Sequence, residues 1–316
     1  MHASSAHAYD RVSQYYDLLQ EQRAAANAPQ CAQLLAELVG GGTALELGVG
    51  TGRIALPLAA SGAVVSGIDN SPLMLDRLRD KPGAERLTLV CDDFVDVPIA
   101  GPFDLIYSVF SFGYLLAQSA QVRCLVAVRE RLSASGVLVL QTLVPQAEML
   151  QAGARVTPVL EAPALDAGDA PVLLLCSSTD PVRQLVQQRI VLIGESGTHI
   201  FNDRYRYVWP SELDLMARLA GLELQERWSD WARRPFGASA RADIRLPSCR
   251  VDAAPRPPSW WRRAPQAHGD SARTQIGRLA APDLRLMAVQ RPLSSGNAPA
   301  CTGHRPTRRG RRPGRR

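Results

Sequence analysis

The chain has 316 residues, of which 46% are hydrophobic and 21% charged, a composition typical of soluble globular proteins of one large or two ordinary domains. Its longest apolar run, at 136–144, is far too short to span a membrane, and the N-terminus lacks the pattern of a secretory signal. The six cysteines form no CxxC pair, which argues against a disulfide framework and a zinc site and favours a reducing, cytoplasmic environment.

The net charge of +6 comes from one end of the chain. Residues 250–316 contain 15 arginines and 3 aspartates, whereas residues 1–249 carry 21 basic and 27 acidic side chains. The mildly acidic body does not favour nucleic-acid binding. The tail is rich in Pro, Arg, Gly and Ala without periodicity, which predicts disorder. A solvated tail, an out-of-frame or readthrough extension, and a segment for an anionic partner are the three alternatives for it.

Strands and helices alternate in the first half of the chain. Strands are expected at 43–49, 63–69, 86–93, 103–110 and 137–144, and helices at 51–61, 72–80 and 119–133. Ser71 is the expected N-cap of the second helix, with Pro72 at its first position, and Gly136 marks the break before the fifth strand. This alternation predicts an α/β fold with a Rossmann-like, doubly wound, mostly parallel sheet. The carboxyl ends of its strands share one edge, where a ligand crevice belongs.

The pattern changes after Pro145. Residues 171–210 predict several β-strands with turns near 179–181 and 195–198, and no helix between them. A helix is expected at 211–221, with Ser211 as its N-cap and Gly221 at its end, and further strands at 222–231 and 242–247. The antiparallel strands are therefore expected to form an insert that caps the crevice.

Three alternating glycines, Gly48, Gly50 and Gly52, follow the first strand in the sequence LELGVGTGR. The dinucleotide fingerprint needs its third glycine at position 53, which is Arg53, and the lysine of a P-loop is missing. The spacing suits a backbone that passes beneath a flat ligand without phosphate groups to cradle. Tight packing of helix on strand is the structural alternative.

Acidic residues stand at the ends of the next two strands. Asp69 lies 17 residues after Gly52, where a carboxylate can accept hydrogen bonds from two ribose hydroxyls. Asp92 and Asp93 end the third strand, where a carboxylate can accept from the exocyclic amine of a purine, and Phe94 can pack on its face. A helix cap is the alternative for Asp69, and a solvated turn is the alternative for the pair.

The motif Glu46-x-Gly48-x-Gly50-x-Gly52, followed by these acids, resembles the first motif of the class I S-adenosylmethionine-dependent methyltransferases of the small-molecule type. Similarity extends over about residues 8–245. Residues 87–116 are similar to the passage between the third and fourth strands of the family. Residues 128–141 are similar to its helix, L-x-x-G-G, strand passage, with the second glycine replaced, and residues 204–222 to its sixth strand and last helix. Residues 8–19 resemble the N-terminal helix that closes over the cofactor in one subgroup.

The sequence pattern and the resemblance together predict five regions: an N-terminal helical lid at 1–40, the cofactor-binding core at 41–145, a substrate-cap insert at 146–208, the end of the core at 209–249 and the disordered Arg/Pro-rich tail at 250–316. The tail follows from composition alone. The resemblance also implies a set of residues that bind S-adenosylmethionine: Tyr16, Glu46, Gly48, Gly50, Gly52, Arg53, Asp69, Asn70, Met74, Asp92, Asp93, Phe94 and Ser108.

The acceptor pocket is expected to be lined by Tyr15, Tyr16, the turn at 111–114, Tyr205, Tyr207 and Trp209. The sequence identifies no general base. Tyr16, His199 and Tyr207 are candidates, with helix packing the alternative for Tyr16 and a surface turn the alternative for His199. No metal site is recognisable.

The expected function is methyl transfer to N or O of a small molecule, in bacterial specialised metabolism. The sequence SVFSFG after the fourth strand argues against the DNA-adenine and glutamine types. A nucleotide-dependent oxidoreductase, against which Arg53 counts, and a nucleic-acid-associated methyltransferase acting through the Arg-rich tail are the alternatives. The sequence leaves the oligomeric state open, a homodimer included.

Overall fold

The structure is a computed structural model that describes residues 27–150, 153–159, 172–194 and 197–249. These residues all belong to one compact unit, residues 1–262. Most of the expected N-terminal lid, with Tyr15 and Tyr16, and the whole Arg-rich tail lie outside the described residues.

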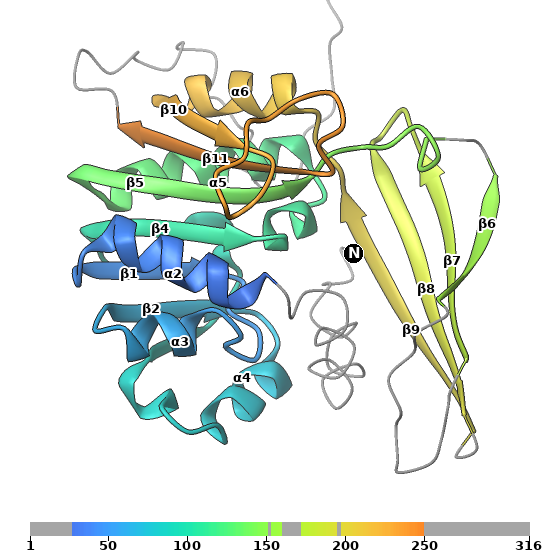
Figure 1. Cartoon of the computed structure of the whole chain (residues 1–316), viewed down its shortest axis with the longest axis horizontal. Helices are drawn as coiled ribbons and strands as arrows, with labels where there is room; N and C mark the ends of the chain where they lie inside the picture. Colours follow the sequence, from blue (N-terminus) through green and yellow to red (C-terminus); the bar gives the residue numbers. More distant parts are fainter. Residues whose placement is uncertain (1–26, 151–152, 160–171, 195–196, 250–316) are drawn as a thin grey trace, which may run out of the picture. The chain divides into compact units, whose positions relative to one another are not determined.

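A seven-stranded sheet in the order β10-β11-β5-β4-β1-β2-β3 forms the centre of this unit (Figure 1). Strands β1 to β5 pair in parallel, whereas β11 is antiparallel to both β5 and β10. The strands are β1 (Thr43–Leu47), β2 (Val64–Asp69), β3 (Thr88–Cys91), β4 (Phe103–Val109), β5 (Leu132–Leu143), β10 (Leu222–Trp228) and β11 (Ala242–Cys249). The mostly parallel order places the ends of β1, β2, β4 and β5 at one edge of the sheet.

Helices cover both faces of this sheet. They are α2 (Ala28–Val39), α3 (Ala55–Ala60), α4 (Pro72–Arg79), α5 (Gln118–Arg131) and α6 (Pro210–Leu219), with short 3-10 turns η1 (Ala84–Arg86), η2 (Phe94–Asp96) and η3 (Ser111–Tyr114). Alternate residues of β1 show the two faces: Leu45 and Leu47 pack in a cluster with α5 and α6, whereas Ala44 packs in one with α2 and α3. The predicted doubly wound α/β fold is therefore confirmed.

A second, antiparallel sheet has the strand order β6-β7-β8-β9 (Figure 1). Its strands are β6 (Ala154–Val159), β7 (Val172–Asp180), β8 (Leu185–Gly194) and β9 (Gly197–Arg206). The sequence predicted strands and turns for β7 to β9, but it gave no sign of β6. The end of β9 contacts η3 of the core, and the chain then runs directly into α6.

Two predicted boundaries were wrong. β5 begins at Leu132, not after Gly136, because Leu132 already pairs with Phe103 of β4, and the strand continues through an irregularity until the pairing resumes at Val137. A Cβ on Gly136 would lie 2.7 Å from the carbonyl oxygen of Phe103, so this glycine permits close strand contact inside β5. The N-cap of α6 is Trp209 and not Ser211, because Pro210 takes the first helical position that its fixed φ suits.

The other cap predictions were right. Ser71 Oγ accepts from the Met74 N–H 3.3 Å away, with Pro72 first in α4. Gly221 follows the end of α6 with φ +78°, a left-handed conformation that favours glycine.

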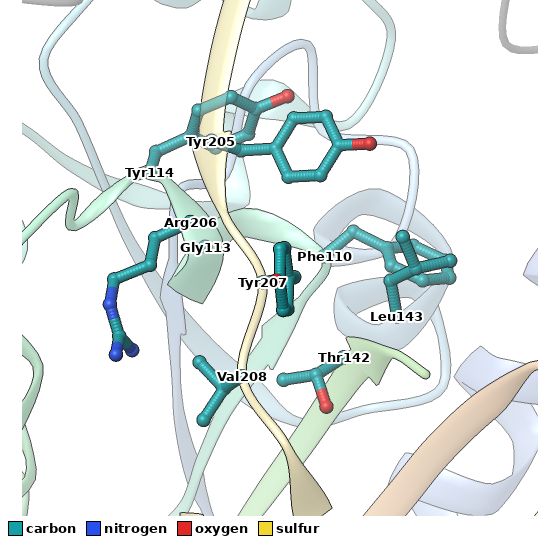
Figure 2. Close-up of a pocket in the computed structure, with 9 residues that line it drawn as sticks. All are labelled: Phe110, Gly113, Tyr114, Thr142, Leu143, Tyr205, Arg206, Tyr207 and Val208. Atoms are coloured by element: carbon teal, nitrogen blue, oxygen red, sulfur yellow. The ribbon is translucent and has the colours of Figure 1, made fainter. Parts of the chain in front are cut away.

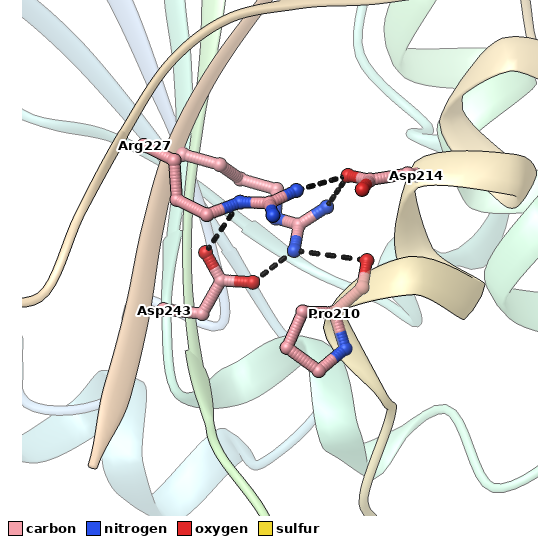
Figure 3. Close-up of polar contacts among 5 residues, drawn as sticks. Pro210, Asp214, Arg227 and Asp243 are labelled. Carbon is pink, nitrogen blue, oxygen red and sulfur yellow. Dashed lines mark hydrogen bonds and ion pairs between the residues drawn. The ribbon is translucent and has the colours of Figure 1, made fainter. Parts of the chain in front are cut away.

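A buried ion network fastens α6 to the neighbouring strands β10 and β11 (Figure 3). Arg245 donates to Asp214 of α6 over 2.7 Å, to the Pro210 carbonyl over 3.3 Å and to Asp243. Arg227 also pairs with Asp214 and, over 3.5 Å, with Asp243. Two arginines thus face two aspartates, and buried charges of this kind are tolerated when they are paired. The network fixes the start of α6, and with it the segment that leaves β9.

Among the described residues, no helix is long and apolar enough to cross a membrane. Nor does that part of the chain bring together three or more His, Cys, Asp or Glu side chains that could hold a metal ion.

Candidate active site

The glycine loop lies between β1 and α3, and all three of its glycines have left-handed φ, at +77°, +53° and +81°. A Cβ on Gly48 would lie 2.4 Å from Cβ of Ser111, and a Cβ on Gly52 would lie 2.2 Å from a methyl carbon of Leu78. Packing therefore needs glycine at both positions, because η3 approaches the loop at Gly48 and α4 approaches it at Gly52. Tight packing, the structural alternative to a ligand-binding role, therefore applies to Gly48 and Gly52. It fixes the conformation of the loop.

Replacing Gly48 with alanine is expected to destabilise the fold by about 3 kcal/mol or more, from left-handed strain together with overpacking against Ser111. Gly62 is the matched control, since its φ is +101° and no atom lies within 4 Å of its Cβ position. Gly62→Ala should cost only the strain, about 1–2 kcal/mol. Urea denaturation of both variants checks this. Equal losses would show that the Ser111 contact relaxes without cost.

Asp69, at the end of β2, accepts hydrogen bonds from the backbone of two segments, the glycine loop and the start of α4. Its carboxylate accepts from the Gly50 N–H at 2.8 Å and from the Ser71 N–H at 2.9 Å. The aspartate thus ties the glycine loop to the start of α4, and Asn70 lies half-buried beside it. A carboxylate can accept about four hydrogen bonds, so these two are compatible with a ligand hydroxyl as a further donor.

Four further residues that were predicted to bind the cofactor divide into exposed and buried ones. Asp92 and Asp93 are exposed after β3; Asp92 accepts from the Asp93 N–H at 2.7 Å, and Asp93 caps η2 by accepting from the Val95 N–H at 2.9 Å. Phe94 and Met74 are only 8% and 2% exposed. The Phe94 ring lies 3.6 Å from the Cβ position of Gly48, so this side chain packs behind the glycine loop.

Glu46 is buried on the α2 side of β1. The Tyr107 hydroxyl donates to its Oε2 over 3.0 Å. Burial raises the pKa of the Glu46 carboxyl to about 8, although the hydrogen bond from Tyr107 and the charge of Arg53 oppose the change. The carboxyl is therefore mostly neutral at pH 7, and it braces β1 against β4.

A cavity of about 160 Å³ opens where β4 and β5 end (Figure 2). It is lined by Phe110, Gly113, Tyr114, Thr142, Leu143, Tyr205, Arg206, Tyr207 and Val208. Four of these residues are aromatic. Phe110, directly after β4, has φ +64°, a strained conformation for a bulky residue that is more common at functional sites.

The η3 turn joins this cavity to the glycine loop. Ser108 is fully buried and its Oγ lies 2.7 Å from Ser111 Oγ, which donates to the Leu47 carbonyl at the end of β1. Ser111 packs against Gly48, while Gly113 and Tyr114 of the same turn line the cavity. A ligand over the glycine loop and a ligand in the cavity would therefore contact one shared turn.

The predicted catalytic candidates do not come together. Tyr207 lines the cavity and is nearly buried, whereas His199 lies near the other end of β9, opposite Leu192. Eight residues of extended chain separate them, about 25 Å. Tyr16 lies outside the described residues. Of the residues expected to line the acceptor pocket, the structure brings Gly113 and Tyr114 of the 111–114 turn, Tyr205 and Tyr207 to one cavity. Trp209 is not among the residues that line it.

Sequence reasoning missed four residues of the cavity wall: Thr142, Leu143, Arg206 and Val208. Thr142 and Leu143 stand at the end of β5, and their position at a strand end was the signal that could have found them. Arg206 is the one charged residue among the four. Its guanidinium donates to Gln121 at 2.6 Å, to Gln184 at 2.7 Å and to Glu212 at 2.6 Å.

The donors along this edge fit a particular kind of ligand. Exposed or half-buried carboxylates end β2 and β3, where they can accept from hydroxyl and amino groups. The glycine loop has no lysine, and its one arginine, Arg53, follows the third glycine. This set suits the adenosyl and amino-acid parts of S-adenosylmethionine better than a pyrophosphate.

Comparison with known proteins agrees with this geometry. Residues 44–136 match the family model described as a methyltransferase domain. The CcbJ methyltransferase from Streptomyces caelestis is 32% identical, with 77% of this chain and 97% of that chain covered and a TM-score of 0.68. An S-adenosylmethionine-dependent methyltransferase from Clostridium acetobutylicum ATCC 824 is 17% identical and shares the fold, with 76% and 98% covered and a TM-score of 0.64.

A further relative is the cypemycin N-terminal methyltransferase of a Streptomyces species. It is 28% identical over 202 residues, which cover 64% of this chain and 80% of that protein. The chain therefore belongs to the class I S-adenosylmethionine-dependent methyltransferases.

Proposed function

We propose that the protein transfers the methyl group of S-adenosylmethionine to an amine nitrogen of a small molecule held in the aromatic cavity. The observation that carries the proposal is the position of this cavity, which shares η3 with the glycine loop and lies at the ends of β4 and β5. An amine needs only to lose its proton before it reacts, and no general base is evident among the described cavity-lining residues. The name of the cypemycin relative, which specifies an N-terminal acceptor, supports nitrogen over oxygen.

The residues of the crevice edge hold the cofactor in this proposal. The cofactor supplies a methyl group on a positively charged sulfur. Asp69 accepts from the ribose hydroxyls while it keeps the glycine loop in place, and Asp93, with Asp92, accepts from the adenine amine. The turn around Ser108 and Ser111 positions the methionine part. The aromatic walls keep water out and align the acceptor, so the chain's main contribution is positioning.

Removing the Asp69 carboxylate is expected to weaken the binding of S-adenosylmethionine by at least about tenfold, since it removes charge-assisted hydrogen bonds. Asp69→Asn, which keeps one acceptor oxygen, should fall between Asp69→Ala and the unchanged protein. Isothermal titration measures all three, with the exposed Asp80→Ala as control. Unaltered affinity in Asp69→Ala would remove the ribose-binding role. No binding by the parent protein would overturn the whole assignment.

The acceptor class is tested by release of S-adenosylhomocysteine with matched small molecules. N-methylbenzylamine, benzyl alcohol and phenol have the same aromatic body, and an alanyl dipeptide supplies a free N-terminal amine. Mass spectrometry should detect product with the amines only. Turnover confined to the alcohol or the phenol would contradict methyl transfer to nitrogen and would assign oxygen as the acceptor atom. The family assignment gives no support to the oxidoreductase or to the nucleic-acid alternative. A role in bacterial specialised metabolism remains part of the proposal.

A further inference from the structure

We propose that the hydroxyl of Tyr207 positions the acceptor by accepting a hydrogen bond from an N–H of its neutral amine. The proposal rests on the proposed function, because it treats the cavity as the acceptor site. It narrows the acceptor to an uncharged amine that keeps at least one hydrogen on the nitrogen. Tyr207 then has a role other than that of a general base.

Tyr207 is a buried residue whose hydroxyl makes no hydrogen bond within the described part of the chain. The residue is 3% exposed and lines the cavity. Most buried polar side chains are hydrogen-bonded, because a hydroxyl that leaves water without gaining a partner costs free energy. A ligand in the cavity can supply that partner. The hydroxyl therefore indicates where a polar group of the ligand binds.

The other polar side chains of the cavity wall do not offer such a group. Tyr114 donates to a carboxylate of β9, and Tyr205 interacts with other groups as well. The Arg206 guanidinium is held by three hydrogen bonds. Thr142 is the one further lining residue whose hydroxyl makes no hydrogen bond among the described residues. Figure 2 shows the Thr142 oxygen pointing away from the ring of Tyr207, which lies among the other lining side chains.

Contacts of the backbone and of the ring hold Tyr207 in place. Its N–H donates to the Gln184 carbonyl over 3.0 Å, and its carbonyl accepts from Gln184 Nε2 over 3.2 Å. The rings of Tyr207 and Trp209 meet edge to face, with their centroids 6.1 Å apart. A hydroxyl on a ring that is held in this way has little freedom left to lose when a ligand binds, so it is suited to fixing the orientation of that ligand.

The charges around the cavity favour the uncharged form of an amine. None of the nine lining residues that the structure describes is acidic, and one of them, Arg206, is positively charged. Burial raises the pKa of the Tyr207 hydroxyl above its usual value, although the charge of Arg206 opposes the change, so the phenol is not ionised near neutral pH. An ammonium ion would lose hydration here without gaining an opposite charge among the lining side chains. The neutral amine, which has the lone pair that the reaction needs, is the form that fits.

The proposed hydrogen bond leaves the reacting lone pair free. When an N–H of a neutral amine donates to the Tyr207 oxygen, the lone pair on the nitrogen remains available. This lone pair forms the new bond to the methyl carbon as the carbon–sulfur bond breaks, and the nitrogen becomes positively charged. A positively charged nitrogen donates more strongly through its N–H, so the hydrogen bond stabilises the transition state more than the bound amine.

The test compares N-methylaniline with anisole, which has a similar shape but an ether oxygen in place of the N–H group. Both compounds are uncharged at pH 7.5. The full-length chain, saturated with S-adenosylhomocysteine, is titrated with each compound by ligand-observed NMR. The unchanged protein should bind N-methylaniline at least about fivefold more tightly than anisole. Tyr207→Phe removes the hydroxyl and keeps the ring, so it should reduce this preference to about twofold or less and leave the affinity for anisole unchanged.

Thr198→Val is the matched control, since it removes a hydroxyl from an exposed position of β9 and should keep the full preference. Equal affinity for the two compounds in the unchanged protein, tighter binding of anisole, or binding of neither compound would overturn the proposal. A full preference in Tyr207→Phe would do the same, and so would a parallel loss of affinity for both compounds, which would assign Tyr207 a structural role.

Thr142→Val separates the two hydroxyls. A preference that is lost in Thr142→Val but kept in Tyr207→Phe would assign the hydrogen bond to Thr142 and overturn the proposal. Binding of S-adenosylhomocysteine is measured in the same proteins. Its absence in the unchanged protein would overturn the proposed function, so a failure of the cofactor site is seen separately from a failure of amine recognition.

Discussion

Replacing Arg206 with methionine is expected to lower the free energy of unfolding by about 3–5 kcal/mol. The side chain makes three short hydrogen bonds, to Gln121 of α5, to Gln184 before β8 and to Glu212 of α6. Methionine fills a similar volume but leaves the Glu212 carboxylate without its ionic partner. Glu212 would keep only the amide donors of Gln184 and Gln118. An uncompensated charge that is mostly buried is costly, which is why the expected loss is large.

Chemical denaturation of three variants separates this charge effect from a loss of packing. Arg204→Met is the matched control, because Arg204 lies two residues away on the same strand and is exposed; its cost should stay within about 0.5 kcal/mol. Arg206→Met combined with Glu212→Gln should recover part of the loss, since the orphaned charge is removed. A double variant as unstable as the sum of the two single ones would contradict the coupling.

The location of Arg206 makes this prediction relevant to the site. The residue ends β9 and its backbone lines the cavity, and its carbonyl oxygen lies 3.0 Å from the Cβ position of Gly113. The network therefore joins the second sheet to the core at the wall of the cavity. Within the described part of the chain, Arg206 makes no side-chain hydrogen bond or ion pair with the glycine loop, so we expect cofactor affinity to change less than acceptor affinity in Arg206→Met.

The parts of the fold that follow from local patterns were predictable from the sequence. Apolar runs of four to eight residues located the parallel strands, and Ser71 with Pro72 located the start of α4, because caps depend on neighbours in sequence. The predicted start of α6 was wrong because two local rules compete there. Serine is a common N-cap, which favoured Ser211, but proline suits the first helical position, so the helix begins at Pro210. β6 offered no apolar run with clear boundaries.

Contacts between distant segments could not be predicted. Gly48 meets Ser111, and Arg206 meets Gln121, 85 positions away in the sequence. Such pairs depend on how the strands are ordered and on how the second sheet packs on η3, which no local pattern encodes. The expectation that the glycines merely make room for a ligand was therefore incomplete. Gly48 and Gly52 also allow Ser111 and Leu78 to pack against the loop.

The second large effect concerns Glu46 and the pH dependence of stability. The pKa of this carboxyl is about 8 in the folded protein and 4.5 in its ordinary environment, because burial disfavours the charged form. Between these two values the folded state holds a proton that the unfolded state has released. Stability should therefore fall as pH rises from about 4.5 to about 8 and change little from this source above that range. At about 1.4 kcal/mol for each pH unit, the difference sets a ceiling of about 5 kcal/mol.

Glu46→Gln removes this titration while its amide oxygen can still accept from the Tyr107 hydroxyl. The variant should gain stability relative to the unchanged protein as pH rises, and the difference between the two should be largest at pH 8 and above. Urea denaturation at pH 5, 6, 7 and 8 measures it, with the exposed Glu85→Gln as control. The difference between the two free energies of unfolding cancels the contributions of the other acidic groups. These include Glu212, whose lowered pKa acts in the opposite direction at low pH. A constant difference between Glu46→Gln and the unchanged protein across this range would mean that Glu46 is already ionised in the folded state. The buried charge would then need compensation beyond that provided by Tyr107 and Arg53.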